Sequence, residues 1–130
     1  METLIVELDE RIGKPAAKRL IAFAQAARES LPNDVMDVIL FGSRARGNNR
    51  RNSDWDVAIL ISDENRRVEV RRQLGGLAAL MSDFGFHISP LVVPAPGGVS
   101  NPSSWIVSSA LANAIASEGI GIPSFTLIGR

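Results

Sequence analysis

The chain has no cysteine, which excludes disulfide bonds and thiolate metal sites. It also has no apolar run approaching the ~20 residues that a membrane-spanning helix requires. Acidic residues come early, at Glu2, Glu7 and Asp9, whereas a secretory signal begins with positive charge and an apolar core. We therefore expect a cytoplasmic protein without membrane contact.

An excess of charge is absent too, because 14 basic and 14 acidic side chains balance to a formal net charge of zero. No overall field favours nucleic acid, so direct binding of DNA or RNA is not expected. The basic residues are nevertheless uneven, with 12 arginines and only 2 lysines. Eight of the arginines form two groups, Arg44, Arg46, Arg50 and Arg51, and then Arg66, Arg67, Arg71 and Arg72. We interpret the first group as phosphate contacts, which suit guanidinium, and the second as a solvated surface. Arginine-rich codon usage is an alternative explanation for both.

The most informative stretch begins with an apolar run over residues 35–41, continues through Gly42 and Ser43, and leads to a second apolar run over residues 57–61. This order predicts a strand, a tight turn, a short polar segment and a second strand. Gly42 permits the turn and a close approach of backbone to a ligand. If a helix begins at Ser43, its free N–H groups suit an anion such as a triphosphate.

Two carboxylates follow that turn. Residues two apart on a strand point to the same face, so Asp54 and Asp56 share one side and Trp55 takes the other. Two neighbouring carboxylates repel each other unless a proton or cation intervenes, and hard oxygen ligands favour Mg²⁺ or Mn²⁺. Each feature alone is explained by an ordinary turn or a solvated strand end. Their combination predicts a metal-assisted phosphate site.

The segment from Phe41 to Gly47, Phe-Gly-Ser-Arg-Ala-Arg-Gly, is separated by a short stretch from Asp54-Trp55-Asp56. With ten residues between Ser43 and Asp54, it resembles the signature of the polymerase-β-type nucleotidyltransferase superfamily, in particular its minimal (MNT-type) branch. The strong match covers residues 35–62. The resemblance implies catalytic, metal-binding roles for Asp54 and Asp56, with Mg²⁺ or Mn²⁺ as cofactor. It also implies that ATP or another nucleoside triphosphate binds at Gly42, Ser43, Arg44 and Arg46.

The chain departs from this family where a later strand carries a third carboxylate. Ser89 falls at the expected place, and a hydroxyl is a poor metal ligand and a poor base at neutral pH. His87 has the same strand parity as Ser89 and is the alternative base or ligand. Asp83 precedes the strand and is expected to cap a helix or turn.

The remaining pattern predicts a small α/β (α+β) domain over residues 1–130, with a mixed sheet of about 3–5 strands and helices mainly on one face. Residues 1–12 fit either a helix or a strand. Helices are expected from Pro15 to about Leu31, from an Asp63 cap to about Ser82, and from a Ser103 or Ser104 cap to Glu118-Gly119. Strands are expected over 35–41, 55–61 and 84–93, with Pro90 indicating an edge or a bulge. The pair Gly75-Gly76 allows close packing or marks a break. Residues 94–102 are expected to be a loop, and residues 120–128 a short closing strand or a packing arm.

Two functions remain open. The first is a metal-dependent nucleotidyltransferase that moves AMP from ATP to a protein, since minimal members of the family pair with helical HEPN-type toxins. The second is a catalytically weak nucleotide-binding antitoxin or regulatory module that acts by complex formation. Self-association, or a partner surface at Phe125-Thr126-Leu127-Ile128, is compatible with both. Modification of a sugar or an antibiotic is disfavoured.

Overall fold

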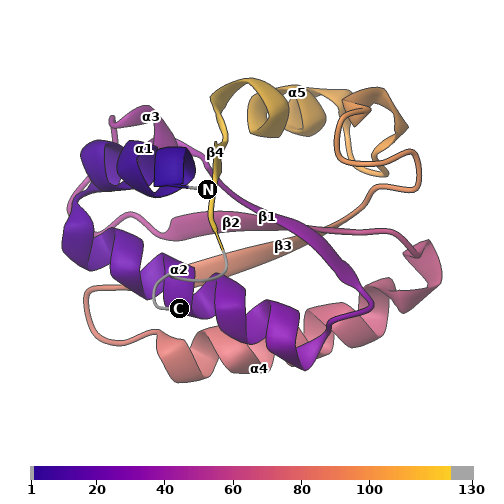
Figure 1. Cartoon of the computed structure of the whole chain (residues 1–130), viewed down its shortest axis with the longest axis horizontal. Coiled ribbons are helices and arrows are strands. Elements are labelled where there is room, and N and C mark those ends of the chain that lie inside the picture. The colour runs from indigo at the N-terminus through magenta and orange to yellow at the C-terminus, as the bar shows by residue number, and fades with distance from the viewer. Residues whose placement is uncertain (1, 124–130) are drawn as a thin grey trace.

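The computed structural model describes residues 2–123, and side chains from Glu7 onward (Figure 1). The elements, in chain order, are α1 (Glu2–Ile12), α2 (Lys14–Ser30), β1 (Val35–Phe41), α3 (Ser43–Arg46), β2 (Trp55–Ile61), a 3-10 turn η1 (Glu64–Arg66), α4 (Arg67–Met81), β3 (Ile88–Pro94), a 3-10 turn η2 (Pro102–Ser104), α5 (Ser109–Glu118) and β4 (Ile120–Gly121). The ambiguous N-terminal segment is therefore a helix. None of the helices in this part of the chain is long and apolar enough to span a membrane.

The four strands form one mixed sheet in the order β3-β2-β1-β4. β1 and β2 are antiparallel neighbours joined by the Gly42 turn and the polar segment after it. β2 and β3 are parallel, so the chain must cross over between them, and α4 provides the crossover. β4 pairs antiparallel with β1 at the opposite edge. The mixed sheet agrees with the predicted fold class.

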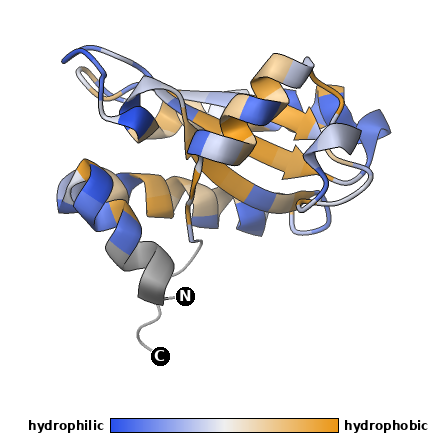
Figure 2. Cartoon of the chain, turned by 90° about the horizontal axis from the view of Figure 1, so that it is seen from above, coloured by the Kyte–Doolittle hydropathy of each residue, from blue (hydrophilic) through white to orange (hydrophobic). Residues whose placement is uncertain are grey.

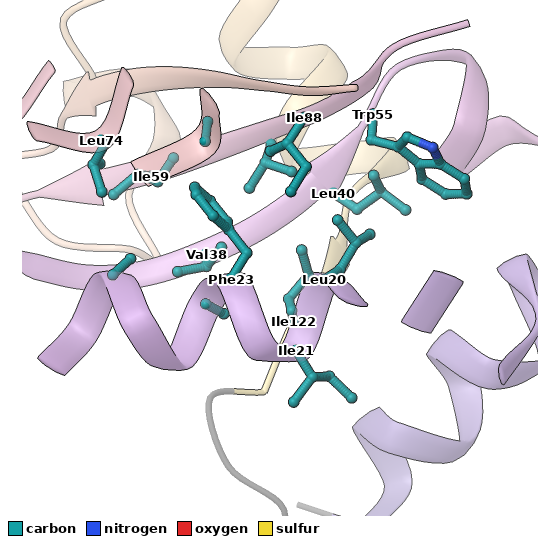
Figure 3. Close-up of a cluster of buried hydrophobic side chains, with 14 of the residues drawn as sticks. Leu20, Ile21, Phe23, Val38, Leu40, Trp55, Ile59, Leu74, Ile88 and Ile122 are labelled. Atoms are coloured by element: carbon teal, nitrogen blue, oxygen red, sulfur yellow. The ribbon is translucent and has the colours of Figure 1, made fainter. Parts of the chain in front are cut away.

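Helices cover both faces of this sheet unequally. On one face, α1, α2 and α4 close the larger core, in which Leu20 and Phe23 pack against Val38, Leu40 and Ile59 (Figure 3). On the other face, α5 and η2 close a smaller cluster with residues such as Leu60 and Trp105. Figure 2 shows the apolar strands lying between these layers. The prediction of helices mainly on one face is confirmed, and burial on both faces explains why residues 57–61 are continuously apolar.

β3 begins later than predicted. The segment 83–86 forms a tight turn in which the amides of Asp83 and Phe86 each donate to the other's carbonyl oxygen, and Gly85 has a φ of +90°. Phe84 is fully exposed at this turn, so its apolar character misplaced the start of the strand. Pro90 lies on the edge strand, as one of the two predicted alternatives required.

α5 also begins later than predicted. Its N-cap is Ser108, whose hydroxyl accepts a hydrogen bond from the Leu111 amide at 3.2 Å. Ser104 lies instead in η2 and donates to the Asn101 carbonyl oxygen at 2.8 Å. The predicted cap at Ser103 or Ser104 is therefore wrong, whereas the helix end at Glu118-Gly119 is confirmed.

Two smaller expectations are also settled. α4 runs through Gly75-Gly76 without interruption, and a Cβ atom at either residue would meet nothing within 4 Å. The pair thus marks neither a break nor close packing. The predicted closing segment is a short strand, β4, while the rest of it, including Phe125-Thr126-Leu127-Ile128, lies outside the described residues.

Candidate functional site

The turn between β1 and α3 approaches the acidic pair very closely. Gly42 has a φ of +80°, a conformation that side chains other than glycine's rarely allow. A Cβ atom at this position would lie 2.6 Å from Oδ2 of Asp56. Glycine is therefore required twice here, for the backbone conformation and for the space that the Asp56 carboxylate occupies.

The helix predicted to begin at Ser43 is a single turn, α3. Its amides at Ala45 and Arg46 donate to the Gly42 carbonyl oxygen at 3.1 and 3.0 Å. Gly47 ends the turn in the left-handed conformation. α3 lies beside α1, where Arg11 Nη2 donates to the Ala45 carbonyl oxygen at 2.6 Å (Figure 1). The turn that would hold phosphates is thus fixed at both ends.

Asp56 is half-buried at the start of β2, and Asp54, just before the strand, is exposed. Burial is the main cause that raises the pKa of Asp56, the Asp54 carboxylate raises it further, and the Arg46 guanidinium opposes both. The two carboxylates repel each other, and a bound divalent cation would relieve this repulsion. The donor set fits such an ion only in part, because no group of three or more His, Cys, Asp or Glu side chains with metal-binding geometry occurs in residues 2–123. Further ligands would have to come from substrate or water.

Ser89 lies directly opposite Asp56 in the β2–β3 register. The neighbouring His87 accepts a backbone hydrogen bond from the Trp55 amide at 2.9 Å. Its Nδ1 is 3.3 Å from Oδ1 of Asp54, with both side chains largely exposed. The structure thus brings together the acidic pair, the serine at the expected third-acid position and the alternative histidine.

Arg46 and Arg44 have different surroundings. Arg46 Nη1 lies 3.1 Å from Oε1 of Glu118, at the end of α5, and its charge reaches Asp56. Arg44 instead donates to the carbonyl oxygens of Ser53 and Arg51 and lies over the Trp55 ring. Sequence reasoning missed Glu118, since 72 residues separate it from Arg46 and no local pattern indicates the pair.

Two hollows lie away from these residues. One of about 370 Å³ lies between α1 and α2 and is lined by Asp9, Lys14, Lys18, Ile21, Ala22 and Gln25. The other, of about 230 Å³, lies between η2 and α5 and is lined by Pro102, Ser103, Trp105, Val107, Ser109, Ala112 and Asn113. Neither includes a residue of the candidate site.

Comparison with known proteins places these residues in a wider context. Residues 25–88 match the family described as polymerase beta, nucleotidyltransferase. A protein of Methanocaldococcus jannaschii named "Putative protein adenylyltransferase MJ1305" is 30% identical over 73 residues, which are 55% of this chain and 50% of that protein. The chain thus spans about half the length of this curated relative.

The chain also has limited similarity to two solved structures. One is a crystal structure of a toxin–antitoxin with AMP-PNP (23% identity, 82% of this chain and 71% of that chain, TM-score 0.47). The other is a Sulfolobus solfataricus protein whose structure is named as that of a "putative nucleotidyltransferase" (18% identity, 79% of this chain and 84% of that chain, TM-score 0.45).

Proposed function

We propose that this chain, whose residues 25–88 match the family described as polymerase beta, nucleotidyltransferase, transfers AMP from ATP to an acceptor hydroxyl in a metal-dependent reaction. The observation that carries this proposal is the close approach of Gly42 to Asp56, which brings the turn that we propose binds phosphate and the acidic pair to one point. A triphosphate at the turn would meet a metal ion held by the pair.

The acidic pair, the glycine turn and Arg46 then have roles in substrate binding. Asp54 and Asp56 hold Mg²⁺ or Mn²⁺, which neutralises charge on the phosphates when bound. The Gly42 and Ser43 turn contacts the triphosphate, and Arg46 braces a phosphate from the side of α5. Arg46 also opposes the rise in the pKa of Asp56, which favours the ionised carboxylate that a cation needs.

The reaction forms a bond from the acceptor oxygen to the α-phosphorus and breaks the bond to the oxygen that leaves with pyrophosphate. The acceptor's hydroxyl proton must go to a base. Ser89 is a poor base, whereas His87 carries an imidazole whose Nδ1 lies 3.3 Å from Oδ1 of Asp54. We therefore assign proton removal to His87 or to bulk water, and expect slow transfer.

We propose a protein as acceptor, because the Methanocaldococcus jannaschii relative is named as a protein adenylyltransferase. By resemblance to the minimal branch, this partner is a helical HEPN-type protein. The chain is then one half of a toxin–antitoxin pair, acting in the cytoplasm without contact to membrane or nucleic acid. Self-association of the chain is the alternative partnership.

A second function is favoured by one observation, the presence of Ser89 opposite Asp56 where a third carboxylate is expected. With that residue, the chain would bind nucleotide and act as an antitoxin or regulator by complex formation. Binding would survive in this case, while transfer would be negligible.

The deciding experiment incubates the full chain with ATP labelled at the α-phosphate and Mg²⁺, alone and with the product of a neighbouring reading frame. Label on the partner, lost in Asp56→Asn, supports the transferase. Calorimetric titration of ATP with and without Mg²⁺ separates the alternatives. Metal-dependent ATP binding without label transfer supports the binding module. Equal ATP affinity in both conditions would overturn the metal site and the metal-dependent transfer built on it.

A further inference from the structure

A column of four stacked side chains lies behind the acidic pair, on the opposite face of the sheet. The Arg44 guanidinium carbon is 4.2 Å from the centre of the Trp55 ring. Trp55 stacks on Phe86, with centroids 4.9 Å apart and planes inclined by 22°. The Arg19 guanidinium covers the far side, 4.1 Å from the centre of the Phe86 ring. The column therefore joins α3, the start of β2, the turn over residues 83–86 before β3, and α2.

The N–H groups of Arg44, at one end of this column, bind backbone carbonyl oxygens. Its Nη2 donates to the carbonyl oxygens of Ser53 at 2.9 Å and Arg51 at 3.0 Å, and its Nε donates to Ser53 at 3.2 Å. Ser53 immediately precedes Asp54. The Arg44 guanidinium thus contacts both neighbours of Asp54 in the chain. Its face packs on the ring of Trp55, and its N–H groups bind the carbonyl oxygen of Ser53.

The indole edge contributes little to this arrangement. Trp55 Nε1 is buried and has no hydrogen-bond partner among the described residues. Buried donors are normally paired, so the presence of tryptophan here reflects its ring faces more than its polar atom. Those faces are the ones that Arg44 and Phe86 cover.

We propose that Arg44 is a positioning residue for the metal site, which fixes Asp54 next to Asp56 by clamping the segment 51–55, and that it does not bind phosphate. The proposal rests on the proposed function, because it assumes that the acidic pair binds a cation. It separates the two motif arginines by role: Arg44 is committed to the protein backbone and the indole, while Arg46 reaches Asp56 and Glu118.

A purely electrostatic role and a positioning role predict opposite changes in cation affinity when the charge of Arg44 is removed. If charge alone decides, removing the positive charge that lies on the Ser53 carbonyl, next to Asp54, should strengthen cation binding. Loosening Asp54 should weaken it, since residues that orient metal ligands typically contribute 10–100-fold to metal affinity. The sign of the change therefore identifies the role.

The experiment measures Mn²⁺ binding to the full chain, without nucleotide, by electron paramagnetic resonance. The variants are Arg44→Gln, Arg44→Lys and, as a matched control, Arg51→Gln, which loses the same charge from the same segment but keeps its carbonyl. We expect about tenfold weaker Mn²⁺ binding in both Arg44 variants, because an ammonium cannot stack and fork as guanidinium does. Arg51→Gln should bind Mn²⁺ at least as tightly as the wild type.

Fluorine NMR of protein labelled with 5-fluorotryptophan gives an independent reading. Trp55 lies in the column, whereas Trp105 belongs to the other core cluster. We expect the Trp55 signal to move in the Arg44 variants while the Trp105 signal, which reports that the chain is folded, stays in place. Arg51→Gln should leave both signals unchanged.

Several outcomes would overturn the proposal. Mn²⁺ affinity that is unchanged or higher in Arg44→Gln excludes positioning. Calorimetric titration of ATP into the same variants gives a second test: a loss of affinity for ATP alone that Arg44→Lys restores would make Arg44 a phosphate contact and also exclude positioning. Failure of the proposed function looks different: wild type and Asp56→Asn would then bind Mn²⁺ equally weakly, and the positioning role would be rejected with the site.

Discussion

At the scale of single residues, the site depends on the missing side chain at Gly42. We expect Gly42→Ala to abolish Mg²⁺-dependent ATP binding, because its Cβ would lie 2.6 Å from Asp56 Oδ2 and displace that carboxylate. It should also lower the free energy of unfolding by about 1–3 kcal/mol through backbone strain. Calorimetry of ATP binding and urea denaturation measure the two effects.

Gly13 offers a matched control for this substitution. It too is a helix N-cap, with φ 88° and ψ 153° against 80° and −160° for Gly42. Its Cβ atom, however, would meet only Pro15 at an ordinary 3.9 Å. Gly13→Ala should therefore show the loss of stability and keep ATP binding. Equal ATP binding by both variants would mean that Asp56 can move without consequence.

Asp56 gives a second prediction at this scale, from the sign of its pKa shift. Burial first and Asp54 second raise the pKa of Asp56 in the folded chain. The ionised carboxyl therefore destabilises the metal-free folded chain. The free energy of unfolding falls as pH rises from the ordinary pKa of aspartate through the raised pKa of Asp56. Asp56→Asn should be more stable than wild type at pH 7, by at most about 1 kcal/mol because solvent screens the repulsion.

Urea denaturation across pH in the presence of a chelator measures this effect. The difference between Asp56→Asn and wild type should vanish at pH values well below the ordinary pKa of aspartate, where both side chains are neutral. Asp63→Asn is the control, since Asp63 is exposed and caps η1 at the far end of β2. It should not show the gain in stability at pH 7 that is expected of Asp56→Asn. A wild type that is more stable than Asp56→Asn at pH 7 without metal would contradict the prediction.

At the scale of elements, the parallel pairing of β2 and β3 determines which residue faces the acidic pair. Asp56 and Ser89 are partners in the register, so Ser89→Asp adds a third carboxylate beside the first two. If transfer is slow for lack of that group, Ser89→Asp should raise Mg²⁺-dependent transfer by about 10²-fold, the low end for a positioned base. A rate assay with labelled ATP and the partner protein measures this change.

A matched control for Ser89→Asp is Ser62→Asp, which adds the same charge at an exposed residue beyond the other end of β2. It should leave the transfer rate unchanged. Brisk wild-type transfer that survives both His87→Ala and Ser89→Ala would show that two carboxylates suffice. Unchanged metal affinity in Ser89→Asp would show that residue 89 does not reach the metal.

The same elements show how far local sequence patterns determine the fold. β1 and β2 have their predicted limits, because mainly apolar runs are bounded there by Asp34 and Gly42 in β1, and by Asp54 and Ser62 in β2. β3 and α5 begin four or five residues later than expected, at Ile88 and Ser109. In both cases an apolar residue before the true start, Phe84 or Ile106, belongs to a turn or loop whose conformation depends on contacts with distant segments.

The candidate site divides in the same way. Strand parity and the glycine turn predicted that Asp54, Asp56 and Gly42 would come together, because these signals lie within fifteen residues of each other. The partners of the motif arginines were not predictable. Glu118 lies 72 residues after Arg46, and the stacking of Phe86 on Trp55 exists only once β3 pairs with β2.

At the scale of the whole molecule, the sheet separates two apolar clusters that share β2. Ile59 belongs to the larger cluster and Leu60 to the smaller, and both side chains are fully buried. A strand buried on both faces links the packing of α2 and α4 to that of α5. A single domain over residues 1–130 stays a prediction, and it requires that both clusters unfold together.

The two tryptophans test that prediction, since Trp55 lies in the larger cluster and Trp105 in the smaller. With 5-fluorotryptophan labelling, both fluorine signals can be followed through one urea titration. We expect the same midpoint for both, because coincident transitions at separate probes indicate one cooperative unit.

Ile59→Ala removes side-chain atoms from the larger cluster only. It should nevertheless lower the free energy of unfolding reported by both tryptophan signals equally, by about 2–5 kcal/mol. Gly75→Ala is the control, because Gly75 is exposed in α4 and an added Cβ would meet nothing within 4 Å. It should not lower the urea midpoint of either signal. A Trp105 signal that unfolds first, or ignores Ile59→Ala, would mean that α5 and its cluster form a separate unit.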